Sequence, residues 1–125
     1  MIIAVLQFEL AIHGAESLKD KRRVVRSVKD RLHREHMVSV AEVARLDSLA
    51  VARLGVAAVG NDGKHLASVL DRITDKLRAL TDAELVWTTR ELIRGREPDD
   101  GPAELDEDAL AAELLARADA IDEDA

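Results

Sequence analysis

A dense run of basic residues is the part of this sequence with the clearest chemical capability. Eight Lys and Arg side chains lie between residues 19 and 34, against Asp20, Asp30 and Glu35. Cations at this density can bind the phosphates of a nucleic acid, which releases counterions and makes the affinity depend on salt. The residues that we expect to make such contacts are Lys19, Lys21, Arg22, Arg23, Arg26 and Lys29.

The same run also fits a solvated helix surface with local ion pairs. Asp30 is four residues from both Arg26 and Arg34, which is a spacing at which opposite charges attract on a helix. Both interpretations of the basic run stay open at this point.

Other kinds of site have little support in the sequence. The chain has no cysteine, which excludes disulfides, thiolate metal sites and cysteine nucleophiles. His33 and His36 are three residues apart, but a metal site needs three or four ligands, so we expect neither a metal nor a cofactor. Residues 60–63, Gly-Asn-Asp-Gly, lack the features of a P-loop or a dinucleotide-binding loop and predict a turn that caps a helix.

We do not expect an enzyme, because no carboxylate pair or Ser–His pair stands out. Aromatic residues make up only 2% of the chain. Proteins that recognise single-stranded RNA stack bases on aromatic side chains. Phe8 is expected in the core and Trp87 alone cannot form such a platform, so an RNA partner would be structured and bound by charge and shape.

Hydrophobic periodicity predicts the elements that position the basic run. Residues 2–12 alternate with period two, which is typical of a strand with one buried face. Residues 18–35 place Leu and Val at three- and four-residue steps, which predicts an amphipathic helix that begins after the N-cap Ser17. The other expected elements are strands over residues 37–43, 50–59 and 84–93, and a second helix, capped by Asn61 or Asp62, that ends at residues 81–82.

The resulting order, β-α-β-β-α-β, predicts an α+β protein with a ferredoxin-like βαββαβ sandwich. Its four-stranded antiparallel sheet would carry both helices on one face, and the other face would stay open or pair with a partner. In the last strand, we expect one side to carry Leu85, Trp87, Thr89, Glu91 and Ile93.

Charge divides the chain into two parts. Residues 1–95 contain 16 basic and 13 acidic residues, a net charge of +3, whereas residues 96–125 contain 2 and 12, a net charge of −10. We therefore expect a ferredoxin-like domain over residues 1–95, followed by an acidic linker and a short amphipathic helix or disordered tail. This tail either solubilises the protein or folds over the basic helix and competes with nucleic acid.

We expect a cytoplasmic protein that does not enter a membrane. No segment approaches the roughly 20 apolar residues that a membrane span requires. Residues 1–12 lack both the basic start and the cleavage site of a signal peptide.

The run IIAVLQFELAIHGAESLKDKRRVVRSVKDRL, followed by VSVAEV and LGVAAVGND, resembles the YlxP-like family of short uncharacterised bacterial proteins. The resemblance covers residues 1 to about 94 and implies a ferredoxin-like fold, without an established activity. Its members often occur beside translation-initiation and ribosome-maturation genes, which implies a ribosome-linked role. Many members have a Trp-containing hairpin after the AEV motif, whereas residues 44–50 here read ARLDSLA.

We therefore expect a non-enzymatic accessory factor that contacts ribosomal RNA or a ribosomal subunit through the basic first helix. The alternative is a structural or regulatory module whose open sheet face, with Ile3 and Val5, forms a homodimer or binds a small effector. Salt distinguishes them, because RNA binding weakens steeply with ionic strength while apolar association does not.

Overall fold

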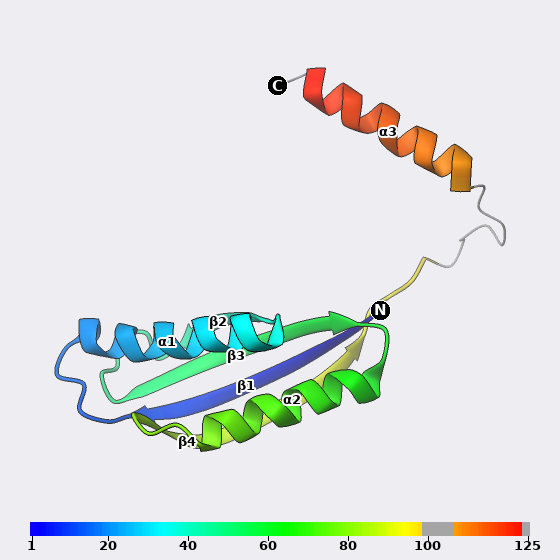
Figure 1. The fold of residues 1–125 in the computed structure, drawn as a ribbon. Helices are drawn as coiled ribbons and strands as arrows, with labels where there is room; N and C mark the ends of the chain where they lie inside the picture. Colours follow the sequence, from blue (N-terminus) through cyan, green and yellow to red (C-terminus); the bar gives the residue numbers. More distant parts are fainter. Residues whose placement is uncertain (99–106, 124–125) are drawn as a thin grey trace.

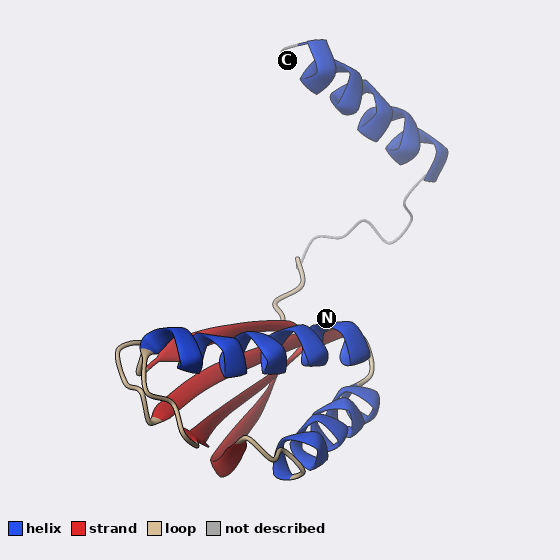
Figure 2. Ribbon diagram, turned by 60° about the vertical axis from the view of Figure 1, so that its left-hand side comes forward, coloured by secondary structure: helices blue, strands red, loops and turns tan. Residues whose placement is uncertain are grey.

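The computed structural model describes residues 1–98 and 107–123. Four strands form one antiparallel sheet in the order β2-β3-β1-β4, and α1 and α2 cover the same face of it (Figures 1 and 2). This arrangement confirms the predicted α+β, ferredoxin-like sandwich. The elements are β1 (Ile2–Ile12), α1 (Leu18–His36), β2 (Ser39–Ala44), β3 (Val51–Gly60), α2 (Gly63–Arg78), β4 (Ala83–Arg94) and α3 (Glu107–Glu123).

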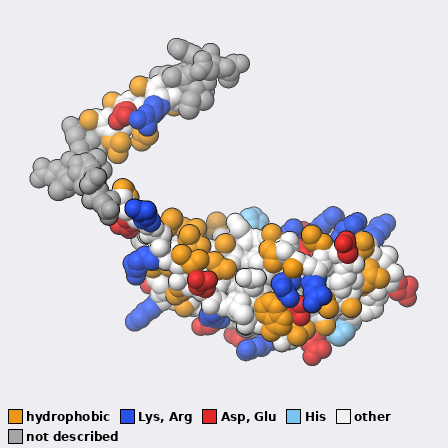
Figure 3. All heavy atoms as spheres, turned by 180° about the vertical axis from the view of Figure 1, so that it is seen from behind, with side chains coloured by type: hydrophobic (Ala, Val, Ile, Leu, Met, Phe, Trp, Pro, Cys, Tyr) orange, Lys and Arg blue, Asp and Glu red, His pale blue; other side chains and the backbone are white. Residues whose placement is uncertain are grey.

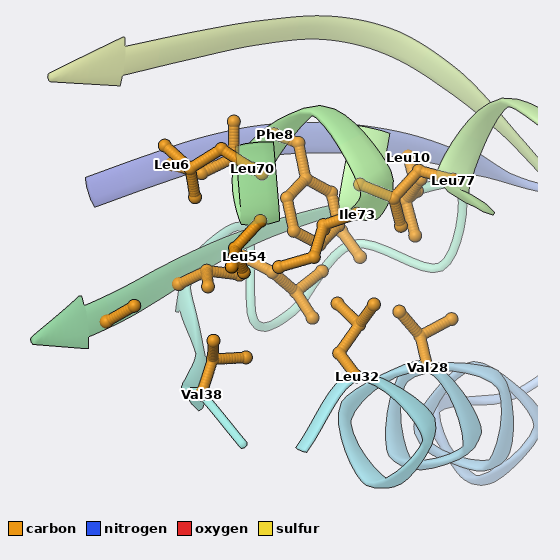
Figure 4. Packing of buried hydrophobic residues seen from close by; sticks show 14 of the residues in the cluster. Leu6, Phe8, Leu10, Val28, Leu32, Val38, Leu54, Leu70, Ile73 and Leu77 are labelled. Carbon is orange, nitrogen blue, oxygen red and sulfur yellow. The ribbon is translucent and has the colours of Figure 1, made fainter. Parts of the chain in front are cut away.

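The core lies between the sheet and the two helices and is almost entirely aliphatic. Alternate residues of β1 point into this core. Among the described residues, the core cluster contains one aromatic side chain, that of Phe8. Figure 4 shows the strand side chains facing those of α1 and α2. The largest members are Leu6, Phe8, Leu10, Leu32, Leu54, Leu70, Ile73 and Leu77.

Both helix starts are capped as the sequence predicts. The Ser17 hydroxyl accepts a hydrogen bond of 3.2 Å from the backbone N–H of Asp20, whose carboxylate accepts one from the N–H of Glu16. The Asp62 carboxylate accepts a hydrogen bond of 3.0 Å from the N–H of Lys64. These bonds satisfy amide groups that a helix leaves free at its first turn.

A bulge changes which residues of β4 share a face. Glu9 of β1 lies opposite Trp87, but the next residue, Leu10, lies opposite Leu85, so that Val86 is an extra residue in β4. Leu85 consequently faces the helices, while Trp87 faces the open side of the sheet. The expectation that these two residues lie on one side is wrong, because strict alternation fails at the inserted residue.

The acidic tail contains a helix, α3, over Glu107–Glu123. Its Leu110, Leu114 and Leu115 are exposed. Residues 99–106, in the middle of the expected linker, lie outside the described residues, and the division of the chain at residue 95 stays a prediction. Of the helices in the described part of the chain, none has both the length and the hydrophobicity to cross a membrane.

Candidate nucleic-acid interface

Four of the six predicted contact residues form one cationic surface on α1. We call Lys19, Arg22, Arg23 and Arg26 the α1 basic surface. Three- and four-residue steps place them on the outer side of the helix, opposite the buried stripe. All four are exposed and line one shallow depression of about 420 Å³ together with Ser27 and Asp30.

The cations of this surface are largely unpaired. Within residues 1–98 and 107–123, neither Lys19, Arg22 nor Arg26 forms an ion pair, and Arg23 only approaches Asp20, at 3.9 Å. An exposed pair at this distance contributes little. The charges are therefore available to a ligand. Lys29, the fifth predicted contact, is half-buried and does not line the depression.

Asp30 forms no ion pair within the described residues, so the local pairs with Arg26 and Arg34 that the alternative interpretation invoked are not present there. The acidic residue that does form ion pairs on α1 near the second helix is Glu35. Arg31 lies 3.4 Å from Glu35, and Glu35 also pairs with Lys76 of α2. The Glu35–Lys76 ion pair connects the two helices, and neither of these pairs includes a residue of the α1 basic surface.

Lys21 is buried and cannot contact a nucleic acid, so its inclusion among the predicted contacts is wrong. Its side chain is 1% exposed, and its ammonium lies 3.0 Å from a carboxylate oxygen of Glu42. It also donates a hydrogen bond of 2.5 Å to the backbone carbonyl of Arg45. The sequence carried a signal for this burial, because Lys21 lies four and seven residues before the buried Val25 and Val28, on the same stripe.

Of the two histidines near the end of α1, His33 has a hydrogen-bond partner and His36 has a shifted pKa. Nδ1 of His33 lies 2.9 Å from the carbonyl oxygen of Val38, at the turn into β2. Burial, together with the nearby Arg72 guanidinium, lowers the pKa of His36 below its usual 6.5. Among the residues that the structure describes, no group of three or more His, Asp or Glu side chains is arranged to hold a metal ion.

The open sheet face is apolar at one end. The strand register places Val59, Ile3 and Ile93 side by side across β3, β1 and β4, and hydrophobic side chains gather at this end in Figure 3. Beside this row is a second shallow depression, of about 440 Å³. Gly55 lies in its floor, and the side chain of Val43, which is the extra residue of a bulge in β2, covers part of that glycine.

A polar cluster occupies the other end of the open face. The Arg53 guanidinium lies 3.3 Å from one carboxylate oxygen of Glu9, and the Trp87 indole N–H donates a hydrogen bond of 3.1 Å to the other. Arg53 also stacks over the Trp87 ring, 5.1 Å from its centroid. Sequence reasoning missed this cluster, because its members come from three strands and no local pattern connects them.

Comparisons with known proteins leave the activity of this protein open. No curated protein matches this sequence. A mutant of SnoaB, a cofactor-independent oxygenase from Streptomyces nogalater, is similar with 12% identity and a TM-score of 0.41, covering 80% of this chain and 98% of its own. A de novo designed protein with a ferredoxin fold, LFR1 1, has 13% identity and a TM-score of 0.41, covering 84% and 96%.

Likenesses at this distance say nothing about function. The family comparison covers most of the chain, since residues 3–90 match a family described as "Protein of unknown function (DUF503)". This protein belongs to the DUF503 family.

Proposed function

We propose that this protein is a non-enzymatic accessory factor that binds structured RNA through the α1 basic surface, with ribosomal RNA in a ribosomal subunit as the expected partner. The observation that carries the proposal is the depression lined by Lys19, Arg22, Arg23 and Arg26, of which three have no acidic partner in the described residues. From Lys19 to Arg26 the helix rises about 10 Å, so one surface can meet several phosphates.

Structured RNA fits this surface better than a single strand. Single-strand recognition stacks bases on exposed aromatic side chains, and α1 carries no Phe, Tyr or Trp. Trp87, the only tryptophan, lies on the opposite face of the sheet and is engaged with Arg53 and Glu9. Recognition would therefore use charge and the shape of the RNA backbone, with little dependence on base sequence.

The resemblance to YlxP-like proteins adds a second line of support. The segment GAESLKDKRRVV, residues 14–25, carries that resemblance and includes most of the α1 basic surface. We place the chain in the YlxP-like group within its family, and the association of that group with translation genes favours a ribosomal partner over other structured RNA.

Co-sedimentation with purified ribosomal subunits tests the proposal. The full chain is compared with Arg22→Glu/Arg23→Glu and with Lys64→Glu/Arg72→Glu, a control pair of exposed cations on α2 that gives the same change in net charge. We expect binding at low salt that falls steeply as salt rises, that the α1 variant loses and that the α2 variant largely keeps. Absence of binding at low salt, or an equal loss in both variants, would contradict the proposal.

The open face supports one alternative function, a homodimer or a small-effector module. The row formed by Val59, Ile3 and Ile93 and the adjacent depression over Gly55 favour an apolar contact. Such an association would persist or strengthen at high salt.

A further inference from the structure

The connection between β2 and β3 holds an exposed residue in an unusual backbone conformation. Arg45 has φ of +62°, in the left-handed region that residues with a Cβ atom rarely adopt. Its carbonyl oxygen accepts hydrogen bonds from the Lys21 ammonium at 2.5 Å and from the Ser48 N–H at 3.1 Å. The strained conformation is therefore held by a charged side chain from another element. Strain that is held in this way is often associated with a functional role.

The ammonium that holds Arg45 is itself costly to bury. Lys21 is 1% exposed, and Glu42 compensates its charge inside the protein. An apolar residue at this position of the stripe would pack against the sheet without that cost, but it could not donate a hydrogen bond to the Arg45 carbonyl. The ion pair thus provides something that simple packing does not, namely a connection between the β2–β3 turn and the first turns of α1.

This connection carries a further cation, Arg45, whose backbone is in contact with the first turns of α1. Figures 1 and 2 both show the β2–β3 connection at the same end of the sandwich as the start of α1. Lys21, which holds that connection, directly precedes Arg22 in the helix. The Arg45 side chain is exposed and forms no ion pair within residues 1–98 and 107–123.

We propose that Arg45 is a contact residue for duplex RNA, and that Lys21 is the positioning residue that presents it. This inference rests on the proposed function and specifies its ligand. Cations on two separate elements can contact the two phosphate backbones that border one groove of an RNA helix, whereas one helix alone would follow a single backbone. The buried Lys21 thus contributes to binding without touching the RNA.

Arg45→Gly is the first test, because glycine accepts the left-handed conformation while the charge is removed. Lys64→Gln is the matched control, since it removes one exposed cation that has no ion pair in the described residues, at the start of α2. Duplex RNA is titrated into each full-length protein at several salt concentrations. For Arg45→Gly we expect binding about eightfold weaker near 0.1 M salt and a salt slope smaller by about 0.9, as for one lost phosphate contact. Lys64→Gln should bind as the unchanged protein does.

Lys21→Met/Glu42→Gln tests the positioning role. This pair removes both buried charges and keeps every surface cation, so a purely structural role predicts unchanged affinity in the folded variant. We expect a loss similar to that of Arg45→Gly, and little further loss when the Arg45 substitution is added. Such non-additivity would show that the two sites act on one contact.

Three outcomes separate this inference from the function on which it rests. Weakened binding by Arg45→Gly with an unaffected control supports it. Unchanged binding by Arg45→Gly, while Arg22→Glu/Arg23→Glu still abolishes binding, would overturn the role of Arg45 and leave the proposed function intact. A protein that does not bind duplex RNA at low salt overturns both.

Discussion

Replacement of Lys21 by Met should destabilise the domain strongly, although a long side chain still fills the site. The substitution leaves the Glu42 carboxylate, which is 15% exposed, without its counter-ion, and it removes a charged donor from the Arg45 carbonyl. Removing one partner of a buried ion pair costs about 3–5 kcal/mol. Because Glu42 retains some contact with water and Ser48 still donates to Arg45, we expect about 3 kcal/mol, at the lower end of that range.

Adding Glu42→Gln to Lys21→Met tests the cause of this loss of stability. In Lys21→Met/Glu42→Gln no charge remains buried, so most of the lost stability should return, since neutral replacements of buried ion pairs are often well tolerated. Urea unfolding followed by far-UV circular dichroism and by Trp87 fluorescence gives both free energies of unfolding, and coincident curves verify a two-state transition. A loss of 3 kcal/mol corresponds to a midpoint lower by about 12–24 °C in thermal unfolding.

Two results would refute this reasoning. A Lys21→Met protein within about 1 kcal/mol of the unchanged protein would mean that the ion pair is not buried as the structure shows. A double variant as unstable as the single one would mean that the loss comes from the packing of Lys21, and not from the unpaired carboxylate.

The remaining predictions concern the N-cap residue Ser17 and the partly buried His36. Ser17→Ala removes the acceptor for the Asp20 N–H and should lower the free energy of unfolding by about 1 kcal/mol, measured by urea unfolding. Ser17→Asp keeps an acceptor at this position and should retain most of the stability. The pKa of His36 is lower in the folded protein than in the unfolded chain, so the unfolded chain binds more protons as the pH falls below 6.5. Stability should therefore decrease from pH 6.5 downward until the folded pKa is passed. Arg72→Gln should raise the pKa of His36, as measured by NMR titration, and a His36 pKa that stays unchanged would exclude Arg72 as a cause.

The local sequence pattern was sufficient to predict the helices and strands of the sandwich and their order. Each depends on neighbours within a few residues: the alternation of residues 2–12, the apolar stripe of residues 18–35, and the hydroxyl and carboxylate caps at Ser17 and Asp62. Once the order β-α-β-β-α-β is known, few antiparallel sandwiches satisfy it. The outward side of α1 was also predictable, because the residues opposite an apolar stripe face solvent.

Contacts between residues distant in sequence determined how Lys21 is paired and which way Trp87 faces. Lys21 is buried because Glu42 and Arg45 come to it from the β2 side of the sheet, and no pattern within α1 contains those partners. Trp87 faces away from Leu85 because one extra residue in β4 reverses the alternation, a change of register that becomes visible only when β4 pairs with β1. The sequence therefore determined which elements form, since helices and strands depend on short-range periodicity. The partners that neutralise and fix the buried Lys21 lie more than twenty residues away in the sequence, and only packing brings them together.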